Sequence, residues 1–507
     1  MKKILTASLV TAMALTSVNA SSVDNRISEL ETELAKLKKD LKKQNKKINE
    51  VKAHDAGDNI KWGADVRTAI DNINYDMASG NDYSKSDLMS LRLWLNMEYA
   101  ADSKNIFKGQ LSMNKAFGAD FYDPMSDGYS RSMSMGGSFD WTGNEALTDN
   151  SLKVRQAYWL YLGDNAFGAD IPWTFSLGRR PSTNGFLANL REDDAAQSPL
   201  GHVINVEFDG LSSKLDLSNV TGISGMSIKL CMGQGSTNAY PMLTPTQYAN
   251  DDNQLEDITL AGFIFEPYND GQFVTKATWY KAFDLPGMKS PMNPDPDDYF
   301  HQFGDMEGGA FSVLVDGLTD DGFLADTKVF ASIAYSKTHP DANNVDGGYM
   351  LGSNESETGT SYWVGTQLPI IENGKLGLEY NHGSKYWRPF TYAEDTMIGS
   401  KVAARGDAYE AYFTYQLTDA LSAQIRYTAI DYDYTGSNGF FGNYSGTPMD
   451  IDGIKQAYTM IENYDDTQLE GMGLTAEEIA GMHMAHDMAD MIVDKAQDLR
   501  FYIRYRF

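Results

Sequence analysis

The ten residues from Asp498 to Phe507 (DLRFYIRYRF) alternate strictly between two kinds of side chain. Leu499, Phe501, Ile503, Tyr505 and Phe507 are apolar or aromatic, whereas the intervening positions include three arginines. A period of two places successive side chains on opposite faces of a β-strand. The segment is therefore predicted to be a strand with one apolar face and one charged face.

The same alternation returns along most of the chain and predicts an all-β fold. It is clear at 60–67, 91–99, 409–417 and 421–434, and residues 418–420 are short enough to join the last two into a hairpin. Long connections such as 118–150 alternate with short ones, as an up-and-down membrane barrel requires. We predict a closed, transmembrane antiparallel β-barrel of about 16 to 18 strands in residues 56–507.

The two ends of the chain are expected to carry targeting signals. Residues 1–20 begin with two lysines, continue with an apolar run and end on small residues, which predicts a signal peptide. The strand that ends at Phe507 resembles the closing strand of bacterial outer-membrane β-barrels, and this resemblance assigns the assembly signal to Phe507, Tyr505 and Ile503. A soluble sandwich could contain such an alternating strand, but it would have little reason to carry three arginines on the other face. The expected location is the bacterial outer membrane, with lipid as a partner.

Residues 21–55 show a different period. Apolar residues recur at alternating spacings of four and three with charged residues between them, which predicts a coiled coil. Its core would contain Ile27, Leu30, Leu34, Leu37, Leu41 and Ile48. We expect this helix to lie in the periplasm and to hold a homo-oligomer together, a trimer by analogy with porins, with peptidoglycan as a further expected partner.

A second helical pattern lies between 465 and 497. Thr475 and Glu478 have the spacing of a capping box. We expect this insert either in a large extracellular loop or folded into the barrel as a plug. His483, His486 and Met488 are candidate ligands for a soft metal such as copper, and packing of a Met-rich helix is the favoured alternative.

The charge of the chain excludes some partners. With 70 acidic and 42 basic residues the formal net charge is −28, which disfavours nucleic-acid binding. Acidic clusters such as 192–194 and 320–321 are interpreted as solvated loops, and divalent-cation binding at the outer surface is the alternative. No other cofactor is expected. The single cysteine, Cys231, excludes an internal disulfide and a covalently attached c-type haem.

The charged faces of the strands supply candidate pore-lining residues. Basic side chains in a lumen favour anions, although lumen arginines also pair with loop carboxylates in plugged barrels, and the two interpretations are left open. The candidates are Arg92, Glu98, Lys153, Arg155, Arg180, Glu379, Glu410, Arg426, Arg500, Arg504 and Arg506.

Two short motifs carry a family resemblance. The segment 176–181 (SLGRRP) resembles the Gly-Arg turn into the lumen of porins. Together with the stretches 178–183 and 379–384 and the N-terminal helix, it is similar to a little-characterised family of porin-like bacterial outer-membrane proteins of about this length. Enzyme motifs are absent from the sequence, so no catalytic activity is expected. The resemblance implies passive diffusion of small polar or anionic solutes, or alternatively a structural barrel that sheathes a multihaem cytochrome for electron transfer.

Overall fold

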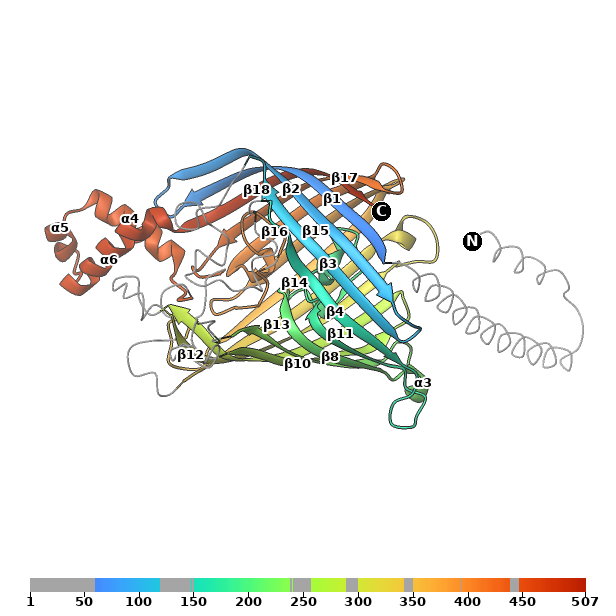
Figure 1. The fold of residues 1–507 in the computed structure, drawn as a ribbon. Coiled ribbons are helices and arrows are strands. Elements are labelled where there is room, and N and C mark those ends of the chain that lie inside the picture. The colour runs from blue at the N-terminus through green and yellow to red at the C-terminus, as the bar shows by residue number, and fades with distance from the viewer. Residues whose placement is uncertain are drawn as a thin grey trace, which may run out of the picture. The chain divides into compact units, whose positions relative to one another are not determined.

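A closed barrel of 16 antiparallel strands makes up most of the described chain (Figure 1). The computed structural model describes residues 60–118, 150–237, 257–288, 300–341, 350–392, 394–437 and 446–507, with the single residues 147 and 239. The predicted signal peptide (1–20) and coiled coil (21–55) lie outside these residues. The predicted closed antiparallel barrel is confirmed, at the lower end of the expected strand number.

The barrel strands follow one another around the wall nearly in chain order. They are β1 (Lys61–Met77), β2 (Asp82–Ala100), β3 (Asn105–Ala116), β4 (Lys153–Gly163), β5 (Trp173–Arg180), β8 (Phe208–Asp216), β9 (Ser227–Ser236), β10 (Ile258–Asn269), β11 (Phe273–Met288), β12 (Phe300–Asp316), β13 (Lys328–Pro340), β14 (Thr358–Ile371), β15 (Gly374–Gly383), β16 (Gly406–Gln416), β17 (Leu421–Tyr432) and β18 (Val493–Arg506). Short elements in the connections are β6 (Gly185–Phe186), η2 (Ala188–Leu190), β7 (Gln197–Leu200), α3 (Ser218–Thr221), η4 (Phe323–Asp326) and η5 (Lys401–Ala403).

Strand β1 closes the barrel because it pairs with β2 on one side and with β18 on the other. The pairing continues to Phe507, whose N–H donates to the carbonyl of Ala64 at 3.0 Å, while the N–H of Ala64 donates to the Phe507 carbonyl at 3.1 Å. Closure satisfies the backbone groups of both strands that would otherwise form free sheet edges.

Connections of different length gather at the two ends of the barrel. One end holds short connections, among them 372–373 and 417–420. The other end holds the long ones, among them 181–207, 384–405 and 433–492, together with the short β1–β2 connection 78–81. The predicted hairpin is confirmed, since β16 and β17 pair in register from Gly406 to Gln416.

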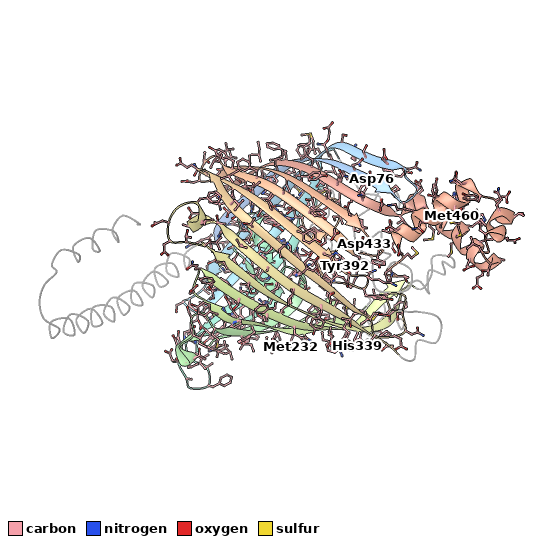
Figure 2. The ribbon with its side chains drawn as sticks, turned by 180° about the vertical axis from the view of Figure 1, so that it is seen from behind. Asp76, Met232, His339, Tyr392, Asp433 and Met460 are labelled. Carbon is pink, nitrogen blue, oxygen red and sulfur yellow. The ribbon has the colours of Figure 1, made fainter. Side chains whose placement is uncertain are left out.

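The two faces of the wall differ in chemistry as the alternation predicted. On β18, Phe501 and Tyr505 are exposed on the outer face, whereas Arg500 and Arg504 are buried on the inner face. Met232 on β9 is another exposed residue of the outer wall (Figure 2). An apolar exterior with a polar interior is the arrangement of a membrane barrel.

The helical insert stands at the rim of the barrel. It consists of α4 (Ile451–Asn463), α5 (Asp466–Gly471), α6 (Ala476–Met488) and η6 (Ala489–Met491), and projects from the end with long connections (Figure 1). Ile451, Ile454 and Ile492 pack on Ala78 in the β1–β2 connection. The insert therefore lies outside the lumen. Among the described residues, no helix is both long and apolar enough to cross a membrane.

The bounds of the insert differ from the predicted 465–497. Helix α4 begins earlier because Asp450 caps it, accepting a hydrogen bond from the N–H of Gly453 at 3.0 Å. The helical region ends earlier because residues from Val493 onward pair with β1. The predicted capping box of Thr475 and Glu478 is present at the start of α6.

Candidate functional site: a constriction in the lumen

Two connections fold into the barrel and fill much of its interior. Inner loop 1 comprises residues 181–207, between β5 and β8, and inner loop 2 comprises residues 384–405, between β15 and β16. Most of their described side chains are buried. These two loops, and not the helical insert, occupy the lumen.

Glycines permit the departure and return of these loops. Gly178 in β5 has a φ of +122°, and a Cβ there would lie 2.4 Å from the carbonyl oxygen of Ala157. Gly406, where inner loop 2 rejoins the wall, has a φ of +140°, and a Cβ there would lie 2.2 Å from the carbonyl oxygen of Asp431. A side chain is excluded at both positions, so the backbone can bend inward only with glycine.

The two inner loops bind each other in the middle of the barrel. The N–H of Asn205 donates to the carbonyl of Phe390 at 2.6 Å, and the N–H of Phe390 donates to the carbonyl of Val203 at 2.9 Å. These bonds form a parallel bridge between Ile204 and Phe390. The loops are therefore a single internal body held by backbone hydrogen bonds.

One side of this body forms an apolar core with the wall. Val203, Trp387 and Phe390 are buried in one cluster with inward residues of β10–β14, including Phe330 and Trp363. His202 bridges the same wall through Ser332 at 2.8 Å and Ser361 at 2.9 Å. Burial of this many large apolar side chains fixes the loops against β10–β14.

The other side of the internal body meets the wall through ion pairs. Asp395 of inner loop 2 accepts hydrogen bonds from Arg67 and Arg500, at 2.8 Å and 3.0 Å, and lies 3.6 Å from Arg92. The guanidinium groups of Arg92 and Arg155 both lie over the ring of Trp94, at 3.6 Å and 4.2 Å from the ring centroid.

Inner loop 1 contributes its own carboxylates. Glu192 lies 3.3 Å from Arg426 and 3.6 Å from Arg504, and accepts a hydrogen bond from the Tyr502 hydroxyl at 2.9 Å. Asp194 pairs with Arg504 at 2.9 Å. The interpretation of Glu192 and Asp194 as solvated loop residues is therefore wrong, because the wall arginines draw them into the lumen.

Further pairs link strand carboxylates to basic residues. Glu410 on β16 pairs with Arg191 at 3.1 Å and also with Lys401, which binds Glu379 at 2.6 Å. Between the closing strands, Asp65 pairs with Arg504 and Asp71 with Arg500. These residues, with Arg67, Arg92, Arg426, Glu192, Asp194 and Asp395, are called the ionic network below.

The candidate pore-lining residues occupy different depths. Eight of them are buried on the inner side of the wall. Lys153 is at the end with long connections, and Glu98 and Arg506, which are partly exposed, are at the opposite end. The role of all eleven candidates in transport stays a prediction. The eight buried candidates are Arg92, Arg155, Arg180, Glu379, Glu410, Arg426, Arg500 and Arg504.

The ionic network separates two cavities. One, of about 330 Å³, is lined by Ala64, Asp65 and Arg504 at the end with short connections. The other, of about 310 Å³, is lined by Tyr75 and Tyr432 at the opposite end. A small space of about 30 Å³, lined by residues that include Arg92, Glu192 and Asp395, lies within the network itself.

Two of the three candidate metal ligands in the insert contact carboxylates, and the third packs against apolar side chains. His483 contacts Asp466 at 2.8 Å, His486 contacts Glu462 at 3.0 Å, and Met488 packs against the apolar cluster at the rim. In the part of the chain that the structure describes, no three His, Cys, Asp or Glu side chains are grouped so that they could hold a metal ion.

Several members of the network were not among the sequence candidates. Arg67 alternates with apolar neighbours on β1, so strand parity could have identified it. Arg191, Lys401 and Asp395 lie in loops without periodicity. The available signal was indirect, because the motifs 178–183 and 379–384 lead directly into inner loops 1 and 2.

A closed antiparallel barrel with an ionic inner face and loops folded into its lumen is a porin-like β-barrel. The chain belongs to a family described as protein of unknown function (DUF3373), whose model matches residues 82–469. No curated protein matches the chain in sequence.

Solved structures similar to this chain include outer-membrane proteins. OmpF of Salmonella typhi, in complex with daunomycin, is 11% identical, with 89% of this chain and 99% of that chain covered and a TM-score of 0.43. OmpT of Vibrio cholerae is 12% identical, with 88% and 97% covered and a TM-score of 0.42. An anion-selective porin of Comamonas acidovorans is 9% identical, with 89% and 99% covered and a TM-score of 0.44.

Proposed function

We propose that this protein is a porin of the bacterial outer membrane through which small polar or anionic solutes diffuse passively. The observation that carries the proposal is a closed barrel with an apolar outer face and an ionic lumen narrowed by two inner loops. A lumen of this kind selects solutes by size and by the side chains it presents to water.

The outer face supports the membrane location. Ile425, Tyr427, Phe501 and Ile503 lie exposed on the adjacent strands β17 and β18. A continuous apolar surface of this kind requires an apolar environment. Lipid supplies it, and strand closure leaves no unpaired backbone edge in the bilayer.

The ionic network supports a narrow pathway for small solutes. Carboxylates of both inner loops neutralise the wall arginines, so the network itself gives little preference for anions.

The alternative that the barrel sheathes a multihaem cytochrome is disfavoured by the same loops, because a partner in the lumen would have to displace the core around Trp387 and Phe390.

Planar-bilayer recording of the purified protein tests the proposal. We expect small, reproducible ohmic steps, and liposome swelling with small sugars and amino acids that stops as solute size increases. If no conductance steps are seen at any protein concentration, the protein does not form a channel and the proposal is refuted. A sheath that lacks its partner would leak without a reproducible step size.

Oligomerisation is proposed to depend on residues 21–55. A heptad seam of Leu and Ile requires partner helices, and further copies of this chain would supply them. The proposed assembly is a trimer of barrels with the coil on the periplasmic side, where it would approach peptidoglycan.

A further inference from the structure

Four basic side chains lie together on the inner wall away from the ionic network. They are Arg180 on β5, Lys214 on β8, Lys229 on β9 and Lys276 on β11. Lys214 and Lys229 are direct cross-strand partners, and Lys229 is repelled by Arg180, Lys214 and Lys276. Like charges directly opposite each other destabilise a sheet, so this basic cluster is not explained by the stability of the wall.

Carboxylates neutralise only part of the positive charge of this cluster. Lys276 lies 3.7 Å from Glu266. Among the residues that the structure describes, no carboxylate is within ion-pair distance of Arg180, Lys214 or Lys229. The cluster therefore differs from the ionic network, in which loop carboxylates neutralise the arginines.

A cavity of about 60 Å³ lies at the cluster, between inner loop 1 and the wall. Arg180 and Lys229 line it together with Ser198, to whose hydroxyl the Lys229 ammonium donates at 2.6 Å. Arg180 is only 8% exposed, and its Nε is buried without a hydrogen-bond partner. A buried donor without an acceptor is costly, and a bound anion would satisfy it.

Most of the remaining cavity lining is apolar, although Ser182, Thr278 and the buried hydroxyl of Tyr280 also belong to it. Leu260, Ile264 and Tyr280 form its wall on β10 and β11. A strongly hydrated inorganic anion would lose its water against these side chains without compensation. A carboxylate with a short apolar tail would place its charge at Arg180 and Lys229 and its tail at the apolar wall.

We propose that this cavity is a binding site for small organic carboxylates. The proposal rests on the proposed function only in that the solute reaches the cavity through the lumen. Binding itself is measurable without transport, so the two proposals can fail separately.

Cys231 provides a reporter for the test. It is the single cysteine of the chain and lines the same cavity. The purified full-length protein is treated with an anionic and a cationic methanethiosulfonate reagent of similar size. The ratio of the two rates, divided by the same ratio for a small free thiol in solution, cancels the intrinsic reactivities of the thiol and of the reagents and measures the local potential. We expect the anionic reagent to react about tenfold faster, as two or three nearby uncompensated charges would produce.

Substitutions then assign the potential to the cluster. Arg180→Gln and Lys229→Gln should each bring the rate ratio closer to one, whereas Lys229→Arg should retain it. Lys375→Gln is the matched control, because Lys375 is also on the lumen side but pairs with Asp193 at 2.8 Å. A heat-modifiability gel confirms that each variant is folded. A normalised rate ratio of one in the unsubstituted protein, or an equal effect of Lys375→Gln, would overturn the proposal.

Ligand specificity is tested by protection of Cys231 from a neutral thiol reagent. Butyrate should slow the reaction saturably, and Arg180→Gln should weaken its apparent affinity by about tenfold or more, as loss of a charged hydrogen bond implies. Butyramide and inorganic phosphate should protect poorly. Protection by phosphate equal to that by butyrate would overturn the assignment to organic carboxylates, and so would no protection by butyrate. Butyrate protection in a protein that passes no current would refute the channel and keep this site.

Discussion

Asp395 is the residue on which the wall arginines converge. Arg67 and Arg500 donate to it, and Arg92 lies within 3.6 Å. We expect Asp395→Asn to leave one uncompensated positive charge and to shift the permeability ratio toward anions by about two- to five-fold, the range for a unit charge 4–10 Å from an ion in water. The reversal potential in a KCl gradient measures this shift.

Two further variants check the sign of that effect. Arg500→Gln should shift selectivity toward cations, because it leaves Asp71 and Asp395 short of a partner. Asp320→Asn removes the same charge from an exposed connection and should leave the reversal potential unchanged. Unchanged selectivity in both Asp395→Asn and Arg500→Gln would show that permeating ions do not pass the network.

At the scale of single residues, the sequence indicates which wall residues face inward but not which side chains they bind. Arg426 and Arg504 were identified because a period of two survives in regular strands. The ion pair between Glu192 and Arg426 could not be predicted, because the two residues are 234 positions apart and loops have no periodic pattern. The choice between a basic lumen and one of paired charges therefore required the structure.

At the scale of elements, β18 depends on its terminal pairing. Deleting Phe507 removes the two backbone hydrogen bonds to Ala64 and the predicted assembly signal. We expect the truncated chain to accumulate unfolded in the periplasm, as shown by loss of the heat-modifiable band from the outer-membrane fraction. Phe507→Tyr keeps an aromatic terminus and should assemble. Normal assembly of the truncated chain would contradict the assignment of the signal.

Helix α6 contains a pH-dependent contact. The hydrogen bond to Glu462, and to a smaller extent the one to Asp487, raises the pKa of His486. The imidazole ring also stacks on the ring of Tyr458, with 4.7 Å between the ring centroids. Because the folded-state pKa is above the unfolded value, the contact stabilises the insert fully below about pH 6.5 and is lost as the pH rises through the raised pKa.

Hydrogen exchange of α6 amides at pH 6 and pH 8, corrected for intrinsic rates, tests this dependence. Protection should be greater at pH 6, and His486→Gln should remove the difference. His339→Gln on β13, outside the insert, is the control. Equal protection at both pH values in the unsubstituted protein would show that His486 does not hold α6 on α4.

Among elements, the strands were predictable and the inner loops were not. The hairpin of β16 and β17 followed from local alternation and a short turn. Inner loop 2 has no such pattern, since Trp387 and Phe390 are buried by contacts with strands far away in sequence. The helical insert follows from its helical period and capping box, but its position outside the lumen depends on the packing of Ile451 on Ala78.

At the scale of the whole molecule, the predicted coil is expected to hold the subunits together. Leu34→Asp with Leu41→Asp would bury two charges in the seam and should dissociate the oligomer while the barrel stays folded. Chemical crosslinking of outer-membrane fractions compares the species formed. Ala35→Asp with Asn49→Asp adds the same charges outside the seam and should crosslink as the unsubstituted protein does. If the Leu34/Leu41 variant gives the same crosslinked species as the unsubstituted protein, the coil is not the contact that holds the subunits together.

The pairing of β1 with β18 has a consequence for biogenesis. Asp65 and Arg504 are 439 residues apart, and Asp71 and Arg500 are 429 apart. These charges meet only when the first and last strands of the barrel join, after every intervening strand is in place. Until then, an open intermediate exposes lone ions and unpaired backbone at its seam, which lipid solvates poorly. Membrane insertion and completion of the ionic network are thus expected to be one late, cooperative event, and chains stalled before it would present that charged seam to periplasmic proteases.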